Sequence, residues 1–335
     1  MDATTLNPIW LRDNCPCPEC RHESGQRLLD TRSIPDDLSV VGVDGTTVRF
    51  SDGHAGTYDP GWLEENHGPR EPRRRRLWDT TLDVRRWSYS DVEAGGSALR
   101  EWLAAVDELG FAILTDCPTE PGTVTRVAEL FGFVRETNYG RLFDVKTVVN
   151  PTNLAYTGLG LGAHTDNPYR DPTPTLQLLH CLASSAEGGE NTLVDAFRVA
   201  EDLPREDFEL LARTPIRFRY ADAETELESE TPVISVDARG DVHAVHYNTR
   251  SAQAFRMSAA EIGGFYPAYQ RFGRMLEDPA YRIQFKLDPG GLFIVDNLRV
   301  MHGRTGYSAT GGERHLQGCY ADRDGLRSRL AVLSR

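Results

Sequence analysis

Two histidines and one aspartate in this chain have the spacing of a non-haem iron site. His164-Thr165-Asp166 separates an imidazole from a carboxylate by one residue. In an extended strand, residues i and i+2 point to the same side, so both side chains can reach one metal ion. His302, far downstream, can supply a third ligand from a neighbouring strand. Two histidines and a carboxylate that leave coordination positions open form the facial triad of Fe(II) oxygenases.

The His-x-Asp pattern occurs by chance in many proteins, so a second feature is needed. Arg314 follows His302 by about the length of one strand and turn. A guanidinium in that place can bind a carboxylate through two parallel hydrogen bonds, which lysine cannot reproduce. These residues together predict a reaction that uses Fe(II), 2-oxoglutarate and O2, with Arg314 holding the distal carboxylate of 2-oxoglutarate.

Short apolar segments separated by Gly, Pro and Asp predict the elements that position these residues. Strands are expected at 111–114, 175–182, 191–194, 233–236, 242–247, 282–287, 292–295 and 316–321. Helical periodicity predicts helices at 97–109, 123–131, 205–213 and 259–277. The pattern is typical of a mainly β fold with flanking helices, in which a jelly roll (double-stranded β-helix) holds the metal site at its mouth.

Cys15, Cys17 and Cys20 form a tight cluster near the N-terminus, whereas the other cysteines are scattered. Clustered thiols in a reducing compartment indicate a metal rather than disulfides. A tetrahedral zinc ion needs a fourth ligand. His54 is the best candidate because it lies in a turn that can fold back onto the cysteines, and His22 is the nearer competitor in sequence. Such a closed site is structural, and it predicts a small β-rich zinc-binding domain.

Several separate motifs agree with one known family in order and spacing. They are Trp10-Leu11-Arg12-Asp13-Asn14-Cys15, Ala155-Tyr156-Thr157, Gln177-Leu178-Leu179-His180-Cys181, Arg314-His315-Leu316 and Tyr320-Ala321-Asp322. In these motifs the chain resembles the gamma-butyrobetaine dioxygenase and trimethyllysine dioxygenase family of Fe(II)/2-oxoglutarate-dependent oxygenases. The resemblance runs over nearly the whole chain. It also implies that His54 is the fourth zinc ligand, that ascorbate serves as reductant, and that the protein is a homodimer.

The resemblance further implies a quaternary-ammonium substrate. Tyr139, Phe143, Tyr156 and Tyr320 occupy the positions of the family's aromatic cage, with Phe143 where tryptophan is usual. Aromatic faces attract a trimethylammonium group, which has no N–H to donate. Asn153 and Asn248 match family positions near the substrate carboxylate.

The implied reaction is hydroxylation of a trimethylammonium carboxylate, first of all gamma-butyrobetaine to L-carnitine. Trimethyllysine, another betaine and 2-trimethylaminoethylphosphonate are alternatives. The phosphonate is less favoured, because Thr249 stands beside Asn248 where an added basic residue would be expected.

Length and charge limit the remaining possibilities. At 335 residues the chain exceeds the usual size of one domain. We expect a zinc-binding domain at 1–67, a linker at 68–80 and the oxygenase domain at 81–335. The net charge of -13 disfavours nonspecific binding to nucleic acid or anionic membranes. An acidic composition is also typical of some source organisms, so it does not by itself indicate a cationic substrate.

A different class of protein also fits part of the chain. In that interpretation the zinc unit and the basic run at 73–76 bind nucleic acid, and the jelly roll is an inert scaffold. The acidic composition favours a solvated linker for the basic run. No apolar run of about 18 residues is present, and the N-terminus lacks the basic and apolar regions of a signal peptide. These features predict a cytoplasmic enzyme without membrane or nucleic-acid partners.

Overall fold

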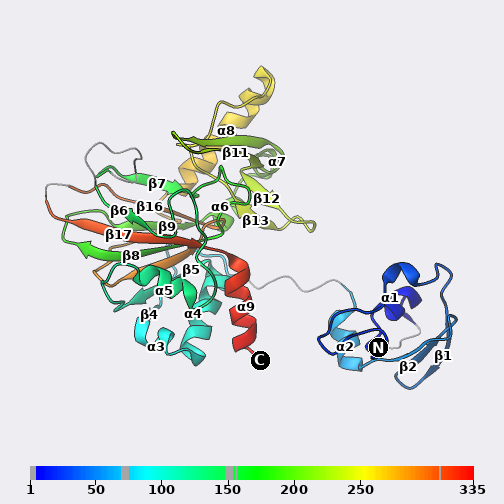
Figure 1. Ribbon diagram of the computed structural model, residues 1–335. Helices are drawn as coiled ribbons and strands as arrows, with labels where there is room; N and C mark the ends of the chain where they lie inside the picture. The colour runs from blue at the N-terminus through cyan, green and yellow to red at the C-terminus, as the bar shows by residue number, and fades with distance from the viewer. Residues whose placement is uncertain (1–4, 69–74, 148–153, 155–156, 309–310) are drawn as a thin grey trace. The chain divides into compact units, whose positions relative to one another are not determined.

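The computed structural model describes residues 5–68, 75–147, 154, 157–308 and 311–335 (Figure 1). The chain divides into two compact units, Met1–Arg73 and Arg74–Arg335. No helix in the described part of the chain is long and apolar enough to cross a membrane.

The first unit combines a small antiparallel sheet with short helices. The sheet has the order β1-β2-β3, formed by Val40–Asp44, Thr47–Phe50 and Ala55–Thr57, and the helices are α1 (Pro8–Asp13) and α2 (Pro60–Asn66). Each helix begins at a side-chain cap followed by proline: Asn7 accepts from two backbone N–H groups of α1, and Asp59 accepts from one of α2.

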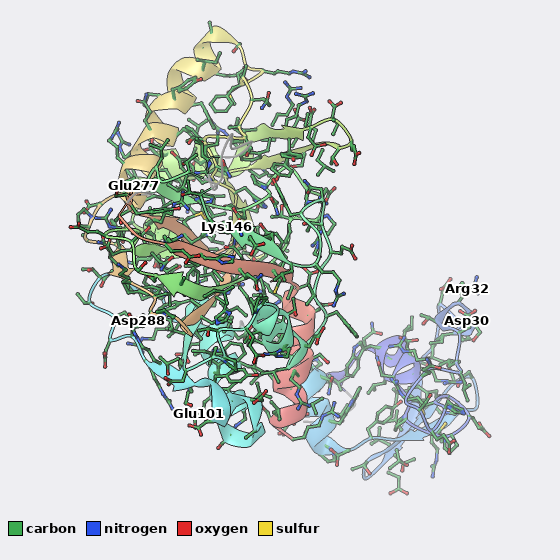
Figure 2. The ribbon with its side chains drawn as sticks, turned by 60° about the vertical axis from the view of Figure 1, so that its left-hand side comes forward. Asp30, Arg32, Glu101, Lys146, Glu277 and Asp288 are labelled. Atoms are coloured by element: carbon green, nitrogen blue, oxygen red, sulfur yellow. The ribbon has the colours of Figure 1, made fainter. Side chains whose placement is uncertain are left out.

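The core of the first unit is small, and its buried residues include Leu11, Val48 and Phe50. At its surface, Asp30 opens a 3₁₀ turn and forms an ion pair with Arg32 (Figure 2). A core of this size leaves the unit dependent on further cross-links.

The second unit contains two larger sheets. One has the order β4-β5-β15-β8-β17-β6, formed by Arg86–Ser88, Phe111–Thr115, Leu292–Asp296, Leu176–Ser184, Arg314–Ala321 and Phe143–Val145. The other has the order β14-β9-β16-β7, formed by Arg282–Phe285, Asn191–Asp195, Val300–Arg304 and Leu161–His164. One apolar cluster joins side chains of both sheets, including Ile113, Leu193 and Phe293, so the sheets pack face to face.

Helices cover the outer faces of this sandwich. Successive residues of β5 point to opposite sides, so Phe111 and Ile113 enter the core between the sheets while Ala112 and Leu114 face the helices. The helices on that side are α3 (Tyr89–Glu93), α4 (Gly96–Leu109), α5 (Thr123–Glu129) and α9 (Arg323–Leu333) (Figure 1).

The β9–β16 side carries a separate cluster of elements. It consists of α6 (Ala196–Glu201), α7 (Arg205–Arg213), α8 (Ala259–Leu276), and the antiparallel pairs β10–β11 (Pro215–Ala221, Glu226–Pro232) and β12–β13 (Ile234–Val236, Val242–Val245). Helix α8 begins with the capping box formed by Ser258 and Glu261, and it continues through Pro267.

Residues 75–80, which fall within the expected linker 68–80, pack against the second unit. Trp78 is only 4% exposed, and its indole N–H donates to the Leu109 carbonyl at 2.7 Å. The Arg76 carbonyl accepts from the Arg299 guanidinium at 2.7 Å. This segment therefore forms part of the oxygenase core.

Candidate active site

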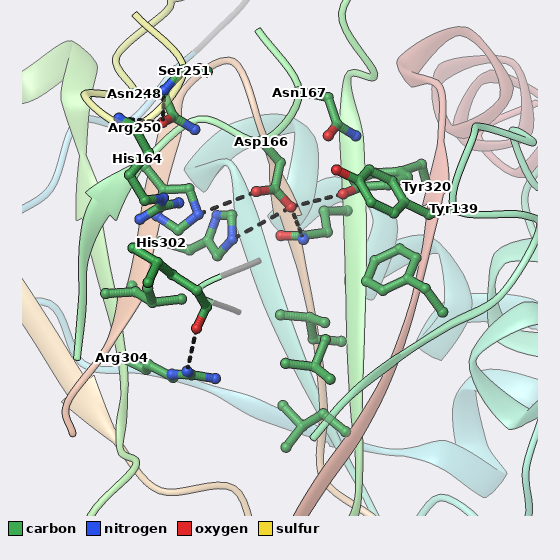
Figure 3. Close-up of a pocket in the computed structure, with 18 of the residues that line it drawn as sticks. Tyr139, His164, Asp166, Asn167, Asn248, Arg250, Ser251, His302, Arg304 and Tyr320 are labelled. Atoms are coloured by element: carbon green, nitrogen blue, oxygen red, sulfur yellow. Dashed lines mark hydrogen bonds and ion pairs between the residues drawn. The ribbon is translucent and has the colours of Figure 1, made fainter. Parts of the chain in front are cut away.

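The two histidines lie opposite each other on neighbouring strands. β7 pairs antiparallel with β16, and His164 faces His302 in the register. Their ring centroids are 4.4 Å apart. Asp166, just beyond the end of β7, completes the group: its Oδ1 lies 3.2 Å from His164 Nε2, and its Oδ2 lies 3.8 Å from His302 Nε2 (Figure 3). All three side chains offer their ligand atoms to one point.

The protonation of these groups suits a divalent cation. His164 Nδ1 lies 2.8 Å from the Gly162 carbonyl, and donating a proton there leaves the Nε2 lone pair facing Asp166. Burial, together with the neighbouring His164, lowers the pKa of His302 to about 3, so this imidazole is neutral near pH 7. Two imidazoles and a carboxylate match the ligand set of a non-haem Fe(II) site.

A cross-strand pair holds the Asp166 carboxylate. Tyr320 on β17 and Gln177 on β8 stand opposite each other in the register. The Tyr320 hydroxyl donates to Asp166 Oδ2 at 2.9 Å, and Gln177 Nε2 donates to the same oxygen. Two donors on one carboxylate oxygen favour its ionised form and restrict its orientation.

The backbone around the group is held by two further side chains. Asn297, fully buried between β15 and β16, accepts from Asp166 N at 2.8 Å and donates to Asp166 O at 2.9 Å. Glu277, which follows α8 and is labelled in Figure 2, accepts from Ala163 N at 2.8 Å. These contacts fix the end of β7 that carries His164.

A cavity of about 490 Å³ opens onto this group. Arg314, the first residue of β17, lines it and is 6% exposed. Its Nε donates to Gly189 O at 3.1 Å and its Nη2 donates to Asn191 Oδ1 at 3.2 Å. Its Nη1 is buried and has no hydrogen-bond partner. A buried guanidinium nitrogen left open at a cavity wall suits an incoming carboxylate, such as the distal carboxylate of 2-oxoglutarate.

Aromatic side chains form another wall of the cavity. Phe143 lies between Tyr139 and Tyr320, with ring centroids 6.3 Å and 5.1 Å away. A Cβ on Gly318 would lie 2.5 Å from the Phe143 ring, so only glycine lets that ring rest on β17. Tyr156 and Asn153 lie outside the described residues.

Tyr169 and Tyr220 extend this wall, although their place in the sequence did not indicate it. Their rings stack with centroids 5.1 Å apart, and Tyr220 also contacts Tyr139 with centroids 5.9 Å apart. Tyr220 comes from the β10–β11 hairpin, for which no strand was expected. Tyr169 shortly follows the His-x-Asp motif, and that proximity is the one feature of the sequence that could have placed its ring in the cavity.

Asn248 lines the cavity, but most of its amide is occupied by the backbone. Its Oδ1 accepts from Arg250 N at 3.0 Å and from Ser251 N at 3.2 Å. Its Nδ2 donates to the Thr165 carbonyl at 2.9 Å. Asn248 therefore shapes the turn that carries Arg250 and Ser251.

The first unit brings together the cysteine cluster and His54. His54 Nε2 lies 3.2 Å from Cys15 Sγ and 3.6 Å from both Cys17 Sγ and Cys20 Sγ. Bond lengths typical of tetrahedral zinc imply sulfur–nitrogen separations of about 3.6 Å, so the donor set fits zinc. His22 lies apart from this group and contacts Ser24.

Close packing supports the same cluster. A Cβ on Gly56 would lie 2.7 Å from Cys15 Sγ, so glycine allows β3 to pass directly over the sulfur. Arg12 donates to Cys20 Sγ at 3.1 Å and to Asp52 Oδ2 at 2.8 Å. Burial raises the pKa of the Cys20 thiol, and the Arg12 guanidinium acts in the opposite direction, toward the thiolate form that a metal requires.

Family comparisons cover both units. The model of the taurine catabolism dioxygenase TauD, TfdA family matches residues 76–320, and the model of the gamma-butyrobetaine hydroxylase-like N-terminal region matches residues 2–64.

Similar proteins extend over almost the entire chain. A gamma-butyrobetaine dioxygenase of Pseudomonas sp. (strain AK-1) is 38% identical, with 99% of this chain and 91% of that protein covered. A trimethyllysine dioxygenase of Meyerozyma guilliermondii is 31% identical over the same shares of the two chains. The human gamma-butyrobetaine dioxygenase is 29% identical, with 97% and 90% covered.

Solved structures share the fold. An asparagine oxygenase in complex with Fe(II), 3-hydroxyasparagine and succinate superposes with a TM-score of 0.53 at 19% identity, covering 69% of this chain and 81% of that chain. The non-haem iron oxygenase OrfP in complex with Fe and 2-oxoglutarate gives a TM-score of 0.54 at 16% identity, covering 74% and 96%.

The fold and the family match define the class of this protein, an Fe(II)/2-oxoglutarate-dependent oxygenase. Within that class, the chain belongs to the gamma-butyrobetaine dioxygenase and trimethyllysine dioxygenase family.

Proposed function

We propose that this enzyme hydroxylates a trimethylammonium carboxylate, and that its substrate is gamma-butyrobetaine, converted to L-carnitine. One observation carries the proposal: the His164, Asp166 and His302 group, the open Arg314 nitrogen and the aromatic wall all meet in a single cavity. The similarity to the Pseudomonas gamma-butyrobetaine dioxygenase supports the choice of substrate.

His164, Asp166 and His302 would hold Fe(II), and Arg314, oriented by Asn191, would hold the distal carboxylate of 2-oxoglutarate. The bound iron and 2-oxoglutarate supply the oxygen activation. The side chains around them orient the substrate, so that one C–H bond lies near the metal and others do not. The hydrogen bonds from Tyr320 and Gln177 would keep the Asp166 carboxylate ionised and correctly oriented toward the metal ion.

The aromatic wall would bind the cationic end of the substrate. Tyr139, Phe143 and Tyr220 present ring faces or edges to the cavity, and no acidic residue lines it among those described except Asp166. Each ring contributes about 0.5–2 kcal/mol to the free energy of binding a cation, and the contribution is largest when the cation is desolvated. Phenylalanine attracts a cation less strongly than tryptophan, so position 143 would weaken the cage relative to relatives that carry tryptophan there.

Cys15, Cys17, Cys20 and His54 would bind a structural zinc ion. All four positions of a tetrahedral ion would be filled by protein, which leaves none for a substrate. The zinc would therefore stabilise the first unit without taking part in the hydroxylation.

A substrate panel tests the proposed reaction. The purified enzyme is given Fe(II), ascorbate and 2-oxoglutarate with gamma-butyrobetaine, trimethyllysine, glycine betaine or 2-trimethylaminoethylphosphonate, and succinate and hydroxylated product are measured together. We expect the highest kcat/KM with gamma-butyrobetaine and no turnover in His164→Ala. Preference for trimethyllysine would contradict the substrate assignment, and absence of 2-oxoglutarate turnover with every member would contradict the reaction.

Replacing Arg314 by alanine tests the cosubstrate anchor. Loss of a buried, charge-assisted contact costs about 2–4 kcal/mol, so the KM for 2-oxoglutarate should rise by about one to three orders of magnitude. Initial rates at varied 2-oxoglutarate and saturating butyrobetaine measure the change. An unaltered KM would place the anchor elsewhere in the cavity.

A further inference from the structure

The turn after β13 presents a cation to the cavity. Asn248 accepts from the backbone N–H groups of Arg250 and Ser251, which fixes the turn from which both side chains project. Arg250 and Ser251 both line the cavity. Among the described residues, no carboxylate forms an ion pair with Arg250, and Asp166 acts on it only at longer range.

The other arginines of the cavity have partners or a separate role. Arg219 pairs with Glu226 at 2.9 Å. Arg304 donates to backbone carbonyls, including that of Leu159 at 3.2 Å. Arg314 is held by Gly189 and Asn191 and has the place of the cosubstrate anchor. Among the arginines that line the cavity in the described part of the chain, Arg250 is thus the one with neither an ion pair nor a role assigned above.

Ser251 provides an independent sign of a ligand at the same place. Its residue is 9% exposed, and its Oγ is buried without any hydrogen-bond partner. A buried hydroxyl without a partner costs free energy, and a bound anion that accepts its proton would remove that cost. A guanidinium and a hydroxyl side by side are a suitable donor pair for a carboxylate.

The turn and the aromatic wall lie on opposite sides of the candidate metal site. Figure 3 shows Arg250, Asn248 and Ser251 on one side of the His164, Asp166 and His302 group, with Tyr139 and Tyr320 on the other. A cation bound at the rings and an anion bound at Arg250 would therefore span the candidate metal site.

We infer that Arg250 and Ser251 form the subsite for the substrate's anionic group, so that the enzyme selects zwitterions over simple quaternary amines. This inference rests on the proposed function, because it assumes a trimethylammonium substrate at the aromatic wall. The ligand chemistry is a carboxylate, which either the substrate or 2-oxoglutarate could provide. The substrate is the favoured source, since Arg314 would hold the distal carboxylate of 2-oxoglutarate and the metal ion would bind its other end.

A paired variant and ligand experiment tests the subsite. Arg250→Gln and Arg250→Lys are compared with the wild type on gamma-butyrobetaine and on its uncharged amide, 4-trimethylammoniobutanamide. KM is measured for each ligand and for 2-oxoglutarate, and binding to the Fe(II)-loaded protein is measured by calorimetry. Arg256→Gln is the matched control, because Arg256 is an exposed arginine nearby that does not line the cavity.

In Arg250→Gln we expect the KM for butyrobetaine to rise about 10- to 100-fold, as loss of a charge-assisted contact requires. The KM for the amide should change less than about threefold, Arg250→Lys should recover part of the loss, and Arg256→Gln should match the wild type. Equal effects on both ligands, or a rise in the KM for 2-oxoglutarate instead, would overturn the subsite.

Calorimetry separates this inference from the proposed function. If the wild type binds butyrobetaine without turning it over, the reaction is wrong while the binding data still decide the role of Arg250. If the wild type binds neither ligand, both proposals are overturned.

Discussion

Tyr320 contacts two parts of the cavity at once. Its hydroxyl donates to Asp166 Oδ2 at 2.9 Å, and its ring lies 5.1 Å from that of Phe143. Resemblance to the family assigned Tyr320 to the aromatic cage, and the hydrogen bond adds a second task that a sequence motif does not reveal. The two tasks reside in different atoms of the side chain, so a single substitution separates them.

Tyr320→Phe removes the hydroxyl and keeps the ring. We expect Fe(II) affinity to fall about 10-fold, as for other partners of metal ligands, with little change in the KM for butyrobetaine. Tyr139→Phe is the control, because it removes a hydroxyl that bonds to Tyr169 at 3.0 Å and does not touch Asp166. Fe(II) titration and steady-state kinetics measure both. A higher KM with unchanged iron affinity would limit Tyr320 to contact with the substrate.

Residue types and spacing predicted the grouping of His164, Asp166 and His302. His164 and His302 are neighbours on antiparallel strands, as expected, whereas Asp166 lies just beyond the end of β7 and is not positioned by the alternation of a strand. Gln177 and Asn297 could not be predicted in the same way. Each forms a hydrogen bond with Asp166 from a different segment of the chain, 11 residues away for Gln177 and 131 for Asn297, and such a bond depends on how the strands pack.

At the scale of elements, apolar strands such as β15 were predicted from the sequence, whereas the polar strand β11 was not. β15 is an apolar run covered on both faces, and β8 is mostly apolar, with Gln177 and His180 inside it. β11 is a polar strand whose burial alternates between exposed and half-buried, so it resembles a loop in sequence. Its partner β10 nevertheless brings Tyr220 and Arg219 to the cavity.

The connection between β15 and β16 is the element on which the metal site depends most. Asn297→Asp keeps the acceptor for Asp166 N but loses the donors to Asp166 O at 2.9 Å and Pro174 O at 2.8 Å. Two buried carbonyls would then face a carboxylate. We expect the free energy of unfolding to fall by about 2–4 kcal/mol and Fe(II) affinity to fall about 10- to 100-fold.

Leu326→Ala separates stability from metal binding. Leu326 lies on α9, is 2% exposed, and packs into the apolar core that contains none of the candidate ligands. Its truncation should cost a similar 2–4 kcal/mol and leave Fe(II) affinity intact. Chemical denaturation measures the stability of Asn297→Asp and Leu326→Ala, and Fe(II) titration measures their iron affinity. Equal iron affinities in the two variants would show that Asn297 has only a structural role.

At the scale of the whole molecule, the two candidate metal sites belong to different units. All the iron-site side chains lie in Arg74–Arg335, and all the zinc-site side chains lie in Met1–Arg73. A core as small as that of the first unit supplies only about 3–5 kcal/mol, whereas structural zinc contributes about 10–16 kcal/mol in small zinc-binding peptides. The first unit should therefore depend on its metal far more than the second.

Cys20→Ser tests this dependence, because serine keeps the size of the side chain but is a poor zinc ligand, and it also loses the contact with Arg12. We expect about one equivalent of bound zinc to be lost and limited proteolysis to cut rapidly within the first unit. Fe(II) binding should persist, since none of its candidate ligands is altered.

Cys117→Ser, at a buried cysteine of the second unit outside the cluster, should retain zinc and resist cleavage. Full zinc content in Cys20→Ser would exclude this cluster as the zinc site, and loss of iron along with zinc would show that the iron site depends on the first unit.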